Sequence, residues 1–458
     1  MATGAEQYPY SGAITANSSV NDNYPRYTKR PESWRDMILR LSPAGETPLY
    51  VITGKMKKEK PTDPIFHWET ASMPNPRATV YGIYTAANLG TSVSTTQAQY
   101  ATVYIKVTVA EKAHFRVGHQ VLLRNSDKMT YDINAKVTDI GSFDATYGYV
   151  AVELLQADTA ITTPTATSYL RTMASSTVGV MMVCGNINAE GGYSPSPVNY
   201  RNQYWENYCQ IFRTPLELTG TALETKLKNQ NLYQEEKAQK LMQHSMEFEL
   251  AMLFGYKTKR NNTESGKEER TTQGIVNYLR ESASANVSDF RIANAGSQWK
   301  AAGKDWLETQ LKNVNSYVPG SYASARRYIK MIFTGFGALG GIQKMVENTS
   351  NVSYNIQPGM GQFGFNVRKL ITPYGEFELI AHPLFNHETT NSYSMLCIDP
   401  SQMVYQALRD TFFKPDPNKD KGGGSGYDGL QEEWLTEAGL ELHHPLTMGY
   451  WTSVGLDG

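Results

Sequence analysis

"EEKAQKLMQHSMEFELAMLFG", residues Glu235 to Gly255, is the stretch from which the fold of this 458-residue chain can be argued. Apolar or small side chains recur along it in a 3-4-3-4 spacing, which places them on one face of a helix with 3.6 residues per turn. A second apolar stripe runs beside the first, so we expect protein to cover the helix on both flanks. The first stripe is Ala238, Leu241, Ser245, Phe248 and Met252, and the second is Met242, Met246, Leu250 and Leu253.

The ends of this helix carry their own signals. Two glutamates near its start and a basic cluster past its end complement the helix dipole. Gly255 can adopt the left-handed conformation that commonly ends a helix. Thr219 and Thr221 are both suitable N-caps. The predicted helix therefore spans 221–254, about 45–50 Å at 1.5 Å per residue.

Composition excludes several classes of protein. The chain has 43 basic and 44 acidic residues, so no global field directs it to nucleic acid or to an anionic membrane. Charged residues make up only 19%, while there are 29 tyrosines and 37 glycines. Charge-poor, aromatic-rich surfaces are typical of the centres of interfaces. We therefore expect much of the surface to contact partners.

Three cysteines, Cys184, Cys209 and Cys397, lie far apart and have no C-x-x-C spacing. They indicate neither a disulfide framework nor a zinc site, and a reducing cytoplasm is the expected place of synthesis. The first 20 residues lack a basic segment followed by an apolar run, and no window approaches 18 consecutive apolar residues. We expect a chain that is neither secreted nor membrane-spanning.

The middle of the chain alternates strands and turns. "ATVYIKVTV", residues 101–109, places every second apolar side chain on one face, the period of a β-strand. Residues 86–172 are predicted to form a small antiparallel barrel or sandwich inserted in a longer hairpin. Farther on, 299–314 has helical spacing, and a hairpin is expected about Pro373-Tyr374-Gly375. The fold class is therefore α+β.

One motif invites a cofactor interpretation. Gly335-Phe336-Gly337-Ala338-Leu339-Gly340 matches G-x-G-x-x-G between a predicted strand and a predicted helix. Dinucleotide binding also needs an acidic residue about 20 positions on, and that region offers only amides. We interpret the motif as a tight glycine turn that lets helix and strand approach closely.

Metal and catalytic motifs are equally weak. The clustered metal-type side chains match no H-E-x-x-H helix or facial triad, and there is no G-x-S-x-G elbow. We predict no catalytic, cofactor or metal site. The side chains considered are His382, His387, Glu388, His443 and His444.

Residues 26–60 carry nine basic and four acidic side chains. Such a segment suits an acidic surface or packaged nucleic acid, and a solvated basic stretch is an equally good interpretation. The basic residues are Arg26, Lys29, Arg30, Arg35, Arg40, Lys55, Lys57, Lys58 and Lys60.

The order of these blocks resembles a family of tailed-bacteriophage major capsid proteins with the Hong Kong 97 phage fold. The resemblance is most specific in "TPL…W" (48–68), in "NYCQIF…TGT" (207–221) and in the long helix. From about Pro43 to the C-terminus it otherwise rests on the order and spacing of the blocks. The β block departs from the minimal family pattern.

The resemblance implies a division of the chain. Residues 1–49 are expected to form an N-terminal arm, and 50–175 an extended loop that overlaps a neighbouring subunit and carries the 86–172 insertion. Residues 176–299 correspond to a peripheral domain with its spine helix, 300–430 to an axial domain, and 431–458 to a C-terminal strand returning to the peripheral domain. The basic residues of 26–40 belong to the arm. The expected overlap residues are Lys55, Lys57, Lys58, Lys60 and Trp68.

The resemblance also implies a function. The expected protein is a structural subunit that self-assembles into hexamers and pentamers of an icosahedral shell around double-stranded DNA, without cofactor or catalysis. Its partners would be further copies, portal, scaffold and cement or decoration proteins, and weakly bound DNA, within a virion capsid assembled in the bacterial cytoplasm. A phage tail or receptor-binding protein is the first alternative, favoured by the Tyr, Gly and Thr content. A soluble nucleotide-binding enzyme is the second.

Overall fold

The computed structural model describes residues 53, 56–71, 75–127, 129, 131–158, 160–162, 166–174, 179–224, 232–317, 329–348, 356–360, 366–415 and 429–458. The described residues fall into two compact units. One is Ile65–Asn207, and the other comprises the described residues before and after it. The expected arm residues Arg26, Lys29, Arg30, Arg35 and Arg40, together with Lys55, lie outside the described residues.

The unit Ile65–Asn207 contains a seven-stranded sheet that closes on itself. Its order is β3-β11-β6-β7-β8-β5-β4, and all its pairings are antiparallel. The two outer strands, β3 and β4, are consecutive in sequence and separated only by Tyr81, so together they join both edges of the sheet into a barrel. The strands are β3 (Arg77–Val80), β4 (Gly82–Tyr84), β5 (Thr102–Thr108), β6 (His119–Asn125), β7 (Asp132–Ser142), β8 (Tyr147–Leu154) and β11 (Gly179–Asn186).

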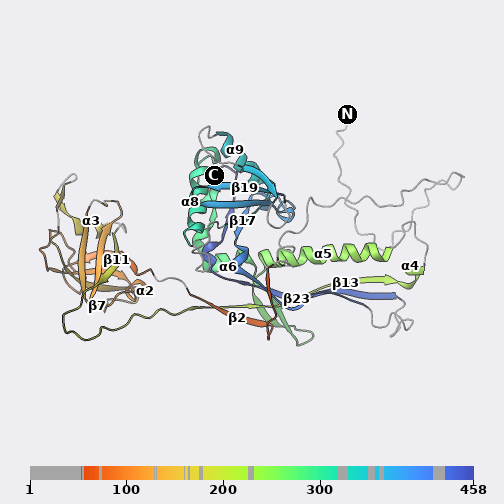
Figure 1. Ribbon diagram of the computed structural model, residues 1–458, viewed down its shortest axis with the longest axis horizontal. Coiled ribbons are helices and arrows are strands. Elements are labelled where there is room, and N and C mark those ends of the chain that lie inside the picture. Colours follow the sequence, from red (N-terminus) through yellow and green to blue (C-terminus); the bar gives the residue numbers. More distant parts are fainter. Residues whose placement is uncertain are drawn as a thin grey trace. The chain divides into compact units, whose positions relative to one another are not determined.

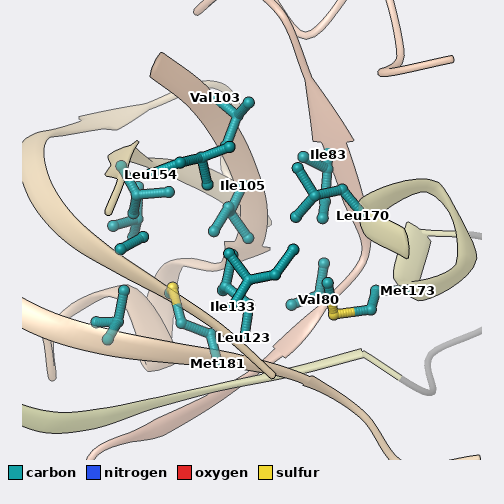
Figure 2. Close-up of a cluster of buried hydrophobic side chains, with 14 of the residues drawn as sticks. Val80, Ile83, Val103, Ile105, Leu123, Ile133, Leu154, Leu170, Met173 and Met181 are labelled. Carbon is teal, nitrogen blue, oxygen red and sulfur yellow. The ribbon is translucent and has the colours of Figure 1, made fainter. Parts of the chain in front are cut away.

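Side chains fill the interior of this barrel (Figure 2). Alternate residues of each strand point inward, as the period of two predicts. Val103, Ile105 and Val107 of β5 are fully buried there. Two short helices, α2 (Val109–Lys112) and α3 (Tyr169–Ala174), flank the strands, and β9 (Ala160–Thr162) pairs with β10 (Ala166–Ser168). The barrel therefore has its own hydrophobic core.

The prediction of an antiparallel β unit was correct, but its limits were too narrow. Strands β3, β4 and β11 all lie outside 86–172 and complete the barrel. They are short, and their hydrophobic pattern does not show which sheet they join. A separate two-stranded sheet, β2 (Ile65–Thr70) with β12 (Gln203–Tyr208), connects the two chain ends of the unit.

The other unit contains a four-stranded sheet in the order β1-β22-β23-β13. Helix α5 lies along one face of this sheet, beside β13 and β23 (Figure 1). The strands are β1 (Lys57–Glu59), β22 (Met403–Lys414), β23 (Gly429–Leu442) and β13 (Gln210–Thr219), and the adjoining helices are α4 (Gly220–Glu224) and α5 (Leu232–Phe254).

A second, seven-stranded mixed sheet in this unit has the order β16-β24-β21-β17-β20-β19-β18. Helices α8 and α9 share its core with Phe290 and Trp451. Helix α6 (Ile275–Ser282) and the hairpin of β14 (Thr258–Asn261) and β15 (Glu268–Thr271) follow α5. The remaining elements are β16 (Val287–Asp289), α7 (Phe290–Ala293), α8 (Trp299–Asn315), β17 (Ile329–Thr334), α9 (Phe336–Asn348), β18 (Ile356–Met360), β19 (Asn366–Thr372), β20 (Gly375–Ala381), β21 (Met395–Ile398) and β24 (Gly449–Thr452).

The helix at 299–314 and the hairpin about Pro373-Tyr374-Gly375 were predicted correctly. The boundaries between the expected peripheral and axial domains do not follow the sheets. Strand β22 falls in the expected axial segment but pairs with β23 in the sheet under α5. The expected return segment 431–458 is divided between the sheets: β23 lies in the sheet under α5, whereas β24 pairs with β21 in the seven-stranded sheet. The sheet that each of these strands joins is decided by its pairing partners, which are distant in sequence.

Helix α5 ends at Phe254, as predicted, but the role of Gly255 differs from the prediction. Helix α4 begins where expected, with the Thr219 hydroxyl accepting from the Ala222 N–H at 3.3 Å. Residues 225–231 lie outside the described residues, so continuity from α4 to α5 is untested. Gly255 follows α5 directly, but it is not among the residues with positive φ. A Cβ there would lie 2.6 Å from the Thr272 carbonyl oxygen, so close chain approach requires this glycine.

Lys330 is fully buried in β17, between the helix layer and the C-terminal segment. Its ammonium group donates to the carbonyl oxygens of Val314 and Thr447, both at 2.7 Å. Val314 lies in the last turn of α8, where carbonyl groups lack helical partners. Lys330 therefore links the end of α8 to the residues preceding β24. Burial lowers the pKa of Lys330 to about 8.

This buried lysine predicts a specific pH dependence of stability. Between about pH 8 and pH 10.5 the unfolded chain binds the Lys330 proton and the folded chain releases it, so folding becomes more favourable as pH rises. The total gain across that window is about 3 kcal/mol. Urea unfolding of the unassembled chain at pH 7.5 and 10 should show this gain in the natural protein and not in Lys330→Met. Lys344→Met, at an exposed position of α9, should retain it. Equal pH dependence in natural protein and Lys330→Met would contradict the assignment.

Candidate assembly surfaces

The seam between α5 and the four-stranded sheet is aromatic at its centre. Phe248 is buried and meets Phe212 of β13 edge to face, with ring centroids 5.3 Å apart. Its other neighbour is Tyr405 of β22, at 6.0 Å. Met252 and Leu253 are buried one turn farther along. These residues of the two predicted stripes do pack, and Ser245 is also buried.

A buried histidine crosses the same seam. The two ring nitrogens of His244 lie 2.9 Å from the Thr214 hydroxyl and 2.7 Å from the Thr436 hydroxyl. Burial lowers the pKa of His244, which favours the neutral ring. Each hydroxyl belongs to a different strand of the sheet, β13 or β23. Because both nitrogens are satisfied, His244 sets the position of α5 along the strands as well as its distance from them.

Toward its N-terminal end, α5 is attached by aromatic and polar contacts. The ammonium group of Lys237 lies 3.6 Å from the centroid of the Phe413 ring and within 6 Å of the Trp434 and Tyr233 rings. The Trp434 indole donates to the Lys237 carbonyl oxygen at 3.2 Å. Tyr233 donates to the Glu432 carboxylate at 2.5 Å, and burial together with that carboxylate raises the pKa of Tyr233 to about 12.

The opposite flank of α5 is left uncovered by the residues that the structure describes. Met242 and Leu250 are both 43% exposed, Ala238 is exposed, and Leu241 and Met246 are half-buried. The described residues cover one flank of α5, and for the other flank the expected cover by protein stays a prediction. The sequence pattern reports only that a flank is apolar, and it does not say whether the covering group belongs to the same chain.

A buried hydrogen bond between two side chains joins α5 to the seven-stranded sheet. Glu249 Oε1 lies 2.6 Å from His382 Nε2, and both side chains have 0% exposure. His382 follows β20, stacks on Phe385 at 4.7 Å and meets Phe333 of β17 edge to face at 5.3 Å. Its Nδ1 atom has no hydrogen-bond partner among the described residues. A proton there would be buried without an acceptor, so the geometry favours a proton on Nε2, donated to Glu249.

The sheet face opposite α5 carries ion pairs. Residues of β13 alternate, so Arg213 and Glu217 point away from the side that holds Phe212. Arg213 lies 2.6 Å from Glu433, and Lys414 contacts the same carboxylate at 3.0 Å. Burial alone would raise the pKa of Glu433, but the two cations outweigh it and hold the pKa below its usual value. These residues line a recess of about 370 Å³.

The expected overlap residues are engaged within their own chain. In β1, Lys57 pairs with Glu59 at 2.5 Å and Lys58 with Asp410 at 2.8 Å. Strand β1 runs parallel to β22 as an edge strand of the sheet under α5, and Lys60 just beyond it is exposed. Trp68 of β2 is buried and stacks on Phe66 at 5.9 Å. None of these contacts requires a neighbouring subunit.

The glycine motif is closed by packing. A Cβ on Gly337 would lie 2.8 Å from the Tyr393 ring, and one on Gly335 would overlap the backbone of Ser392. The first N–H of α9, on Phe336, donates to the Asn386 side chain at 2.6 Å. The glycines therefore admit the segment 391–393 against the turn. The close contact that these glycines allow is therefore with the segment 391–393, and it is not mainly a contact between β17 and α9.

The other chemical candidates are dispersed. His382 is used in the buried pair, and His443 lies 2.5 Å from Glu441. The Glu388 carboxylate accepts backbone N–H groups of its own loop, while His444 caps a short helical turn at positive φ. Across the described residues, no three His, Cys, Asp or Glu side chains gather in a metal-binding cluster. In the same part of the chain, no helix is long and apolar enough to span a membrane.

Sequence reasoning missed the polar residues that position α5. His244, Glu249, His382 and Lys330 occupy buried sites, but no motif marks them. The one available signal was a polar residue at a position flanked by both apolar stripes, as Glu249 is. Its partner lies 133 residues away, so the pairing itself had no local signal.

Comparison with known proteins gives low identities to solved capsid structures. A chain from Mycobacterium phage Bobi is 7% identical, and the match covers 93% of this chain and 96% of that chain with a TM-score of 0.40. A chain of the procapsid of satellite phage P4 is 12% identical over 59% of this chain and 84% of that chain, with a TM-score of 0.33. A comparison with curated protein sequences finds no match.

The family assignment rests on a sequence model that spans both structural units. The model described as the SU10 major capsid protein matches residues 12–454. That range includes the barrel, the sheet under α5 and the seven-stranded sheet. The chain therefore belongs to the SU10 major capsid protein family.

Proposed function

We propose that this major capsid protein self-assembles into hexamers and pentamers that form an icosahedral shell around the double-stranded DNA of a tailed phage. The observation that carries the proposal is the exposed apolar flank of α5 on a helix otherwise seated firmly on its own sheet. Membership of the capsid family supplies the partner, because a shell surrounds each subunit with further copies. Met242 and Leu250 are the side chains that such a copy would cover.

The roles that we propose for the other parts of the chain follow the same reasoning. Residues 1–49 act as an arm along a neighbour, and their basic residues meet acidic protein or packaged DNA. The barrel unit, carried on β2 and β12, extends the overlap between subunits. The seven-stranded sheet forms the axial contacts, and the sheet under α5 the peripheral ones. Portal, scaffold and decoration proteins complete the particle, which is assembled in the bacterial cytoplasm.

The contacts that hold α5 in place matter in a shell because they make the subunit stiff. Packed DNA exerts outward pressure, and a subunit transmits load only if its two sheets do not shift relative to one another. The aromatic seam fixes α5 to one sheet, and the Glu249–His382 pair fixes it to the other. The proposal assigns α5 the role of a beam between them.

Electron microscopy distinguishes this function from its alternative. Purified protein at increasing concentration should give closed shells in negative stain, because many modest contacts between copies add up. A tail or receptor-binding protein would instead give only discrete trimers or hexamers in size-exclusion chromatography. Persistence of a monomer at every concentration, with and without the phage's own scaffold, would contradict both.

The exposed flank of α5 gives a sharper test. The double variant Met242→Glu/Leu250→Glu should fold with a stability within about 1 kcal/mol of the natural chain, because both positions are surface-exposed before assembly. It should form no shells, because two carboxylates would be buried against another copy without cations. Gln234→Glu/Gln243→Glu adds the same charge at exposed polar positions of α5 and should assemble. Normal shells from the first variant would remove this flank from the interface.

The buried pair predicts a difference between two replacements. Glu249→Leu leaves the His382 N–H without an acceptor and should destabilise the chain by roughly 1–3 kcal/mol. Glu249→Gln retains an acceptor at the same place and should lose markedly less. Melting temperature and shell yield should fall in the order natural, Gln, Leu. If the Leu variant proved as stable as the natural chain, the pair would not hold α5 to the second sheet.

A further inference from the structure

The apolar flank of α5 that the described residues leave open is a narrow stripe. Met242, Met246 and Leu250 follow one another at intervals of four residues, so they lie in one row along the helix. We call these three residues the α5 stripe. It is about 12 Å long at 1.5 Å per residue. Met242 and Leu250 are each 43% exposed. Methionine side chains adapt to the shape of a partner, and two helical turns would cover a stripe of this length.

The surface around the α5 stripe is acidic. The exposed half of α5 carries three carboxylates and one ammonium group, because the remaining lysine of the helix, Lys237, is turned toward the Phe413 ring. Among the described residues, neither Glu236 nor Glu247 forms an ion pair. The ammonium group of Lys240 donates to the Gln243 side chain at 3.2 Å. The three carboxylates are those of Glu235, Glu236 and Glu247.

One segment of the chain has a complementary apolar pattern. In "ESWRDMILRLS", residues 32–42, apolar side chains recur at i, i+3, i+4 and i+7, which is the spacing of one helical face. Pro43 follows and would end such a helix. The apolar row spans about 10 Å, close to the length of the α5 stripe. These residues lie outside the described part of the chain, so the helix is a prediction from the sequence. The apolar residues are Trp34, Met37, Ile38 and Leu41.

The charges of this segment are placed to meet an acidic surface. At about 100° per residue, Arg35 and Arg40 fall on either side of the apolar face. Glu32 and Asp36 fall on the opposite side of the same helix. The contact face is therefore apolar with a basic border, although the segment as a whole is neutral. This pattern matches an apolar stripe with an acidic border.

We propose that the segment 32–42 of a neighbouring copy packs as an amphipathic helix on the α5 stripe, with its two arginines beside the glutamates of α5. The inference rests on the proposed function, and it names the part of the neighbouring copy that covers α5. Ten residues, 43–52, separate the segment from Thr53, the first described residue. Extended, they span up to about 35 Å, which is enough to reach an adjacent subunit.

Two other occupants fit the surface less well. The α5 stripe of a second copy would bring the glutamates of two helices together, and like charges repel. Packaged DNA would bring its phosphates against the same glutamates. Both occupants also lack the basic border that residues 32–42 supply.

Photo-crosslinking in assembled shells identifies the occupant. The full-length chain carries p-benzoylphenylalanine in place of Leu250, and subunits with and without a ¹⁵N label are mixed before assembly. Mass spectrometry should find cross-links from position 250 to residues 32–42. Some should join a labelled to an unlabelled peptide, because the segment comes from another copy. The same photoreactive residue in place of Asp305, which is exposed on α8, should give no cross-link to that segment.

Charge exchange tests the ionic part of the contact. Arg35→Glu/Arg40→Glu and Glu236→Arg/Glu247→Arg should each lower the yield of shells about tenfold, because like charges then face each other. Combining the two pairs should restore most of the yield. The melting temperature of the unassembled chain should stay the same, because both glutamates lie on the exposed half of α5.

A matched control uses two other basic residues of the same arm. Arg26→Glu/Arg30→Glu lies before the predicted helix, and combining it with Glu236→Arg/Glu247→Arg should restore nothing. Equal recovery with both arginine pairs, or recovery with neither, would overturn the inference.

The cross-links separate this inference from the proposed function. Shells whose cross-links run from position 250 to another segment, to residues 235–255 of a second copy, or only within one copy would overturn the inference and leave shell assembly standing. Absence of shells from the natural chain would overturn both.

Discussion

The contact between α5 and the four-stranded sheet is the interaction on which the larger unit depends. Phe248 packs against Phe212 of β13 and Tyr405 of β22, and His244 spans β13 and β23. Burying an aromatic side chain stabilises a fold by roughly 1.5–3 kcal/mol, but it allows a helix to slide. The two hydroxyl contacts of His244 remove that freedom. Apolar burial thus supplies the stability, and the polar contacts supply the register.

The same division recurs where α5 meets the second sheet. Glu249 and His382 are fully enclosed, so each would be costly without the other. Such a pair adds little net stability over a well-packed apolar contact, but it tolerates only one geometry. In a subunit that must repeat identically around a shell, uniqueness of geometry is worth more than extra stability. Lys330 has a similar role where α8 ends, since its ammonium group donates to the carbonyl groups of Val314 and Thr447, from two distant segments.

The barrel stands apart in construction. Its sheet closes through the consecutive strands β3 and β4, so among the described residues its two outer strands adjoin one another. Closure also explains why so large an insertion is compatible with the rest of the fold. The barrel buries its own core, and the paired strands β2 and β12 precede and follow it in the sequence.

Local pattern in the sequence was sufficient for the elements. The 3-4 spacing identified α5 to its last residue, and the alternation of 101–109 identified β5. The glycine motif was correctly interpreted as a turn, but its close contact is with the segment 391–393 and not mainly between helix and strand. These features depend on neighbours a few residues away. Tertiary structure decided which flank of α5 is covered, which sheet receives β22 and β24, and where the barrel begins. It also brought Glu249 to His382 and Lys330 to Thr447. Those outcomes depend on pairings between residues far apart in the chain. The spacing of apolar residues shows that a face is buried, but it does not show which distant residues will pack against that face or pair with a buried polar group.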